Sequence, residues 1–151
     1  MTTARTAYRE ADVRGASPVR LVVLLCEQVI EDLRQAARAL EQNDIERRTN
    51  QINHAILVIG HLQSGLDFAN GGKVAQDLDH FYSVLRQNLV QVQFSPSVAG
   101  LTQQITDLLA VREAWIEVER AQKLLATTAA GTVPSSAGGS EPDAVRVDWK
   151  G

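Results

Sequence analysis

Apolar residues recur every three or four positions between residues 18 and 128, which is the period of amphipathic α-helices. The first periodic segment opens at Ser17-Pro18, a hydroxyl N-cap followed by a proline that suits the first helical position. The predicted core stripe of this segment comprises Val22, Cys26, Val29, Leu33, Ala36 and Leu40. The pattern therefore predicts a helix that begins at residue 18 and runs to about residue 40.

Three further segments carry the same period and are separated by turn-forming residues. The second begins at Asn43, where Glu46 completes a sequence resembling a capping box, and it ends at the glycine pair Gly71-Gly72. The third ends before Ser95-Pro96-Ser97, and the fourth fades near Leu125. Their stripes are Ile45, Ile52, Ile56, Ile59 and Leu66; Val74, Leu78, Phe81, Tyr82, Leu85, Leu89 and Val92; and Leu101, Ile105, Leu108, Trp115 and Val118. Four such segments predict an all-α, antiparallel up-down four-helix bundle.

The two ends of the chain differ from this helical region. We expect residues 1–16 to form a short N-terminal arm or helix ahead of the bundle at 17–128. Residues 129–151 are rich in Gly, Ser and Pro and cannot bury enough apolar surface to offset the entropy of ordering, so they predict a flexible tail. Alternating valines precede Trp149 in this tail, and the sequence leaves open whether they dock on the bundle or stay solvated.

Composition and charge narrow the classes of function. The 151 residues carry a net charge of −3, which argues against a protein that neutralises nucleic-acid phosphates. The one cysteine, Cys26, cannot form an internal disulfide, which favours a reducing compartment. No stretch reaches the ~20 apolar residues of a membrane span, and the first residues lack the apolar core of a signal peptide. We therefore expect a cytosolic protein with no membrane insertion.

Two segments contain more apolar residues than one core stripe requires. Residues 21–26 are six consecutive apolar residues, and residues 55–59 are five. At 3.6 residues per turn, Leu24 lies about 200° from the start of its core stripe. Leu57 and Val58 lie roughly 140° and 240° from the stripe of the second helix. Because these side chains leave the predicted core, we expect the N-terminal arm or a partner chain to cover them, which predicts an interaction bundle.

The same segments resemble the flagellin export chaperones of the FliS family. The opening AYREADVRGASPVRLVVLL is similar to the tyrosine-bearing arm, Ser-Pro helix start and Leu-Val run of that family. Further similar pieces are Ser64-Gly65-Leu66-Asp67, Gly71-Gly72, Leu78, Leu108-Leu109 and Arg112-Glu113-Ala114-Trp115. The pieces keep the family's order over about residues 7–118.

The resemblance implies a chaperone that is not an enzyme and uses no cofactor or metal. Such proteins bind the disordered C-terminal segment of flagellin in the cytosol, prevent early polymerisation and support delivery to the flagellar type III export apparatus. The export gate and an anti-sigma factor are further partners that the family implies. We expect a monomer, with a weak dimer as the alternative. The flagellin contacts expected from the arm and from the apolar surplus are Tyr8, Leu21, Leu24, Leu25, Leu57 and Val58.

Two other functions fit parts of the sequence. A histidine phosphotransfer bundle would present His61 with Gly65 four residues on, although Ser64 stands where such sites carry a lysine or arginine. A generic dimerising bundle would instead hide Leu24 and Leu57 in a symmetric interface.

The sequence also predicts where two polar residues lie. We expect His54 to lie near the outer face of the second helix in contact with solvent. Arg112 falls in the apolar stripe of the last helix, which predicts an ion pair with a carboxylate such as Asp67 or Asp32.

Overall fold

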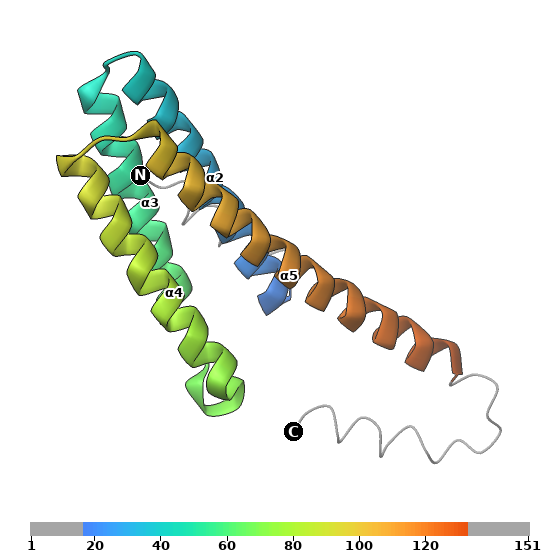
Figure 1. Ribbon diagram of the computed structural model, residues 1–151. Helices are drawn as coiled ribbons and strands as arrows, with labels where there is room; N and C mark the ends of the chain where they lie inside the picture. Colours follow the sequence, from blue (N-terminus) through green and yellow to red (C-terminus); the bar gives the residue numbers. More distant parts are fainter. Residues whose placement is uncertain (1–16, 133–151) are drawn as a thin grey trace. The chain divides into compact units, whose positions relative to one another are not determined.

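The computed structural model describes residues 17–132, and within this range it contains four helices and no strand (Figure 1). The helices are α2 (Pro18–Glu41), α3 (Ile45–Ser64), α4 (Phe68–Phe94) and α5 (Val98–Thr132). The predicted all-α four-helix bundle is confirmed. Tyr8 with the predicted arm, and the predicted tail beyond residue 132, lie outside the described residues.

The chain divides into two compact units, Met1–Ile116 and Glu117–Gly151. In the first unit α3 packs against both α2 and α4, and short loops reverse the chain between successive helices (Figure 1). The second unit contains the C-terminal part of α5, which ends at Thr132 rather than near Leu125 as the sequence predicts. The alanine and threonine residues that follow Leu125 explain this difference, because they continue a helix without supplying a visible apolar stripe.

Side-chain caps fix where the helices begin. The Ser17 hydroxyl accepts a hydrogen bond from the Arg20 backbone N–H at 3.1 Å, as the Ser-Pro pattern predicts. The α3 cap is Asp44 rather than Asn43, and Asn43 instead adopts a left-handed φ of 57°, which asparagine tolerates. Asp67 caps α4, and its hydrogen bonds from the Asn70 side chain and backbone lower the pKa of its carboxyl group.

The glycine pair lies in α4 rather than at the end of the second helix. The preceding helix already ends at Ser64, and Asp67 starts the next one upstream of the glycines. Gly72 breaks the regular geometry of α4 with φ 53° and ψ −129°, a backbone conformation open only to glycine. The glycines therefore permit a kink in the first turns of α4 instead of ending α3.

The core of the first unit combines side chains from all four helices. Tyr82 is the largest fully buried side chain, and Leu101 and Leu108 bring α5 into the same cluster. At the start of α2 the buried residues are Val19 and Val23, whereas Val22 is only half-buried, so the predicted stripe is one position out of register there.

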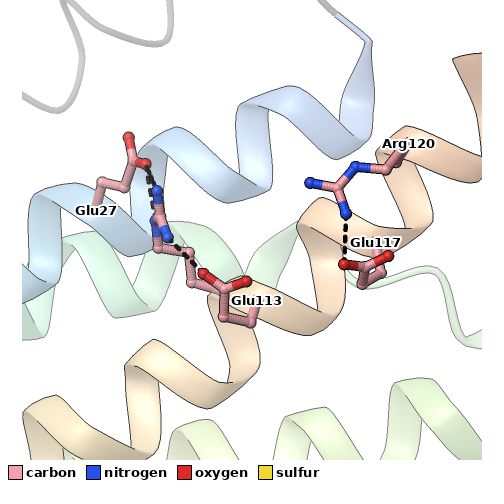
Figure 2. Close-up of polar contacts among 5 residues, drawn as sticks. Glu27, Glu113, Glu117 and Arg120 are labelled. Carbon is pink, nitrogen blue, oxygen red and sulfur yellow. Dashed lines mark hydrogen bonds and ion pairs between the residues drawn. The ribbon is translucent and has the colours of Figure 1, made fainter.

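Arg112 pairs with Glu27 across α5 and α2 and with Glu113 on its own helix (Figure 2). Its guanidinium lies 2.7 Å from the Glu27 carboxylate and 3.1 Å from that of Glu113. The predicted ion pair is therefore confirmed, but its partner is neither Asp67 nor Asp32. In the second unit, Arg120 pairs with Glu117 one turn earlier at 2.6 Å (Figure 2).

The buried position of Cys26 predicts an unreactive thiol. Burial, together with the neighbouring Glu27 carboxylate, raises the pKa of Cys26 to about 12. Since the thiolate is the nucleophile, we expect native protein at pH 8 to react with a disulfide reagent about a thousandfold more slowly than urea-unfolded protein. Absorbance of the released thiol measures both rates, and equal rates would show that Cys26 is accessible in the folded chain.

Candidate functional site

An apolar groove of about 300 Å³ lies where the beginning of α2, the end of α3 and the beginning of α4 meet. Trp115 of α5 completes its wall. The lining residues are Pro18, Val19, Leu21, Val22, Leu25, His61, Leu62, Gly65, Leu66, Asp67, Gly71, Val74, Ala75, Leu78, Tyr82 and Trp115. We refer to this surface below as the apolar groove.

Small residues keep the apolar groove open at the junction of α3 and α4. Gly65 ends α3 and Gly71 lies in the first turn of α4, and both line the groove without a side chain. A Cβ atom at Gly71 would lie 2.9 Å from the Cβ of Ala75, so any larger residue would force the backbone to shift. The kink at Gly72 follows directly and redirects α4 next to this surface.

The polar groups of the apolar groove are few. Asp67 is engaged in capping α4, and His61 is exposed. Val74 is 62% exposed, although it belongs to the lining. A concave, mostly apolar surface with few polar groups is typical of a binding site for apolar side chains of a ligand or a helical peptide.

The structure separates the predicted contact residues into three environments. Leu21 and Leu25 line the apolar groove, with Leu21 half-buried and Leu25 buried. Leu24 is half-buried outside this lining, and Leu57 is 51% exposed, so both leave the core as predicted. The expectation that Val58 leaves the core is wrong, since it is 0% exposed. Because α3 packs against two helices, its buried face is wider than a single stripe.

Sequence reasoning missed most of the α4 side of the apolar groove. Val74 was predicted to belong to the core stripe of the third helix, but it is exposed. The glycine pair was the available signal, because a kink at Gly72 changes the direction in which nearby side chains point. Because the glycine pair was interpreted as the end of a helix, the kink in α4 was not predicted.

A second, polar pocket of about 550 Å³ lies between α2 and α3. Its lining is Gln28, Asp32, Asn50, Gln51, Asn53, His54 and Leu57. We refer to it below as the polar pocket.

A buried hydrogen-bonded pair, His54 and Asp32, forms part of the polar pocket. His54 is 9% exposed, so its predicted solvent-facing position is wrong. Its Nδ1 lies 2.5 Å from the Asp32 carboxylate, which also accepts a hydrogen bond from the Gln28 side chain at 3.0 Å. The partner on α2 explains why a histidine is tolerated on the inner face of α3. Burial raises the pKa of Asp32, and the hydrogen bond from His54 opposes that rise.

Neither surface carries the side chains of a metal centre. Among residues 17–132, His, Cys, Asp and Glu side chains nowhere gather in the groups of three that could hold a metal ion. In the same part of the chain, no helix has both the length and the apolar character needed to cross a membrane.

Comparison with known proteins identifies related chains. The sequence profile of the family described as "Flagellar protein FliS" matches residues 1–122. The flagellar secretion chaperone FliSB of Pseudomonas aeruginosa is 36% identical over 106 residues, covering 70% of this chain and 84% of the relative. The flagellar secretion chaperone FliS of Salmonella typhimurium is 29% identical over 111 residues, covering 72% and 82% respectively. That of Vibrio cholerae is 27% identical over 116 residues, covering 74% and 85%.

Proposed function

The chain belongs to the FliS family of flagellar chaperones, and on that premise we propose that it is a flagellin-specific export chaperone. The relatives are named chaperones, so the protein is a chaperone and not an enzyme. In our proposal it binds the disordered C-terminal segment of flagellin in the cytosol and prevents premature polymerisation. It then supports delivery of flagellin to the flagellar type III export apparatus.

The observation that carries this proposal is the apolar groove, which stays open although the same helices bury a continuous core. A side chain of valine or leucine size gains ~1.5–3 kcal/mol when water is removed from it. Three or four such contacts would give several kcal/mol of gross binding energy, part of which offsets the ordering of a flexible cargo. Leu21, Leu25 and Val74 are the residues that we assign to this contact. Leu57 contributes from outside the groove, and Val58 does not contribute because it is fully buried and, unlike Leu25, lines no groove.

The histidine phosphotransfer alternative gains no support from the position of His61. Its side chain lies at the edge of the apolar groove, and the relatives are chaperones. A phosphoryl group there would add negative charge to a groove that the Asp67 carboxylate also lines.

A single charge in the apolar groove tests the proposal. We expect Val74→Asp to weaken binding of a flagellin C-terminal peptide at least tenfold, because its charge must be desolvated against apolar cargo. Val90→Asp is the matched control, since Val90 is exposed on the same helix and lines neither pocket. Isothermal titration calorimetry with wild type and both variants gives the three affinities.

The two variants must differ for the proposal to hold. We expect Val90→Asp to bind within about twofold of wild type, because an exposed surface change perturbs the fold little. Equal affinities for Val74→Asp and wild type would show that cargo does not use this groove. A wild-type protein that binds no flagellin peptide at all would refute the proposed function itself.

A further inference from the structure

The C-terminal part of α5 exposes an apolar face. Val118, Leu124 and Leu125 are 40%, 66% and 70% exposed, and Ala121 is exposed beside them. Val118, Ala121 and Leu125 are spaced at i, i+3 and i+7, so they share one side of the helix, and Leu124 flanks this row. We refer to these four residues below as the outer face.

The outer face does not continue the core stripe of α5. Leu108 is fully buried in the core, and Leu125 lies about 100° around the helix from it. Three turns before Val118, the same side of the helix carries Asp107, whose carboxylate accepts a hydrogen bond from the Gln103 side chain. This side of the helix therefore changes from polar to apolar beyond residue 117. A contiguous apolar row, unlike a single exposed leucine, is typical of a contact surface.

The tail of the same chain contains a complementary apolar segment. Val145, Val147 and Trp149 alternate with charged residues. In an extended conformation such alternate side chains point to one side and span about 13 Å. The outer face is about 10 Å long from its first to its last residue, so the two lengths match. The match to the family profile ends at residue 122, and it assigns no role to this segment or to the two leucines of the outer face.

The chain between α5 and this segment is long enough to bring the two together. Residues 133–144, which follow Thr132, are rich in Gly, Ser and Pro, and a flexible chain of that length has a root-mean-square end-to-end distance of about 17–21 Å. From the end of α5 the helix measures about 10 Å back to Leu125 and about 21 Å back to Val118. Because linker length and span agree, the effective concentration of the segment at the outer face reaches the millimolar range.

We propose that residues 145–149 dock in an extended conformation on the outer face of their own chain and cover it. Such a contact needs little affinity, because at a millimolar effective concentration a site with a millimolar dissociation constant is occupied for about half of the time. A second copy is a less suitable occupant, since each partner of a stable dimer contributes about 20–30 residues. The outer face offers only three large apolar side chains. The inference goes beyond the proposed function, because it requires neither flagellin nor the apolar groove.

A spin label on the tail tests this contact directly. Lys150→Cys places the label next to Trp149, and the native Cys26 is buried and should not react. In isotope-labelled protein, we expect the amide resonances of the outer face to lose about half of their intensity or more while the label is paramagnetic, as the docked fraction predicts. Chemical reduction of the label should restore these resonances.

Two alanine variants show whether the outer face is the surface that the tail contacts. Leu125→Ala acts on the outer face, and Phe94→Ala is the matched control, since Phe94 is 78% exposed on α4. Alanine is a good helix former and both positions are exposed, so both variants should fold, which circular dichroism checks. We expect Leu125→Ala to reduce the intensity loss at Val118 and Ala121 at least about threefold, because it removes one leucine contact. Phe94→Ala should leave the loss unchanged.

The remaining outcomes overturn the inference. Full intensity at the outer face with the paramagnetic label would show that the tail stays in solvent. Equal intensity losses in Leu125→Ala and in the parent protein would show that the tail contacts a different surface. A mixture of spin-labelled chains with isotope-labelled chains that lack the added cysteine identifies contacts between copies. Intensity loss at the outer face in that mixture would show that a second copy supplies the tail.

Discussion

Val58→Asp is expected to unfold the bundle, whereas Leu57→Asp at the adjacent position is expected to leave it folded. Val58 is 0% exposed and Leu57 is 51% exposed, so only the first substitution places a carboxylate in the core. A buried, unpaired charge costs more than about 4 kcal/mol, which is a large fraction of the ~5–15 kcal/mol that stabilises an ordinary domain. Urea denaturation followed by circular dichroism measures both stabilities.

A milder substitution at Val58 distinguishes the effect of lost packing from the effect of a buried charge. Val58→Ala removes two methyl groups without adding a charge, so we expect a loss of about 1–3 kcal/mol with the fold retained. If Val58→Asp were as stable as Leu57→Asp, the side chain of Val58 would have to reach solvent. The original sequence prediction that it leaves the core would then be correct.

The second large effect is expected at the buried pair of His54 and Asp32. Asp32→Ala removes the carboxylate that faces the His54 Nδ1 at 2.5 Å, and it leaves a buried imidazole without its partner. We expect a loss of about 3 kcal/mol in the free energy of unfolding, which chemical denaturation measures. Replacing both residues with leucine removes both polar groups together, so the double variant should recover most of that loss.

Glu27→Ala is the matched control for the pair. It breaks the Glu27–Arg112 ion pair, whose side chains are 39% and 26% exposed, so we expect a loss of about 1 kcal/mol or less. If Asp32→Ala were as mild as Glu27→Ala, water would have to reach the imidazole, and the pair would not be buried in solution.

The sequence predicted the helices well where the helical period and a strong cap coincide. Ser17 caps α2 as expected, and Ser95 and Pro96 lie between α4 and α5. The prediction failed at the junction of α3 and α4, where two local signals compete. Gly71-Gly72 resembles a helix end, but the Asp67 cap lies upstream and fixes the start of α4 first. The local sequence does not show whether a cap residue or a glycine pair a few residues later decides where one helix ends and the next begins.

The candidate site was only partly predictable because packing is decided by several helices at once. Leu57 leaves the core as its angular position predicts, but Val58 does not, since α3 is covered from two sides. The same two-sided packing places His54 against Asp32, which lies 22 residues earlier in the chain. The apolar groove is lined by residues from α2, α3, α4 and α5. The apolar pattern of one helix cannot predict a surface that four helices form together.

The position of Pro18 and Val19 has a practical consequence for work with this protein. Both residues line the apolar groove at the very beginning of α2. Any affinity tag or fluorescent reporter fused ahead of Ser17 is therefore tethered close to the apolar groove that we propose for cargo, at an effective concentration on the order of millimolar. Such a fusion would compete with weak cargo in binding assays, so labels are better attached at an engineered surface cysteine far from that groove.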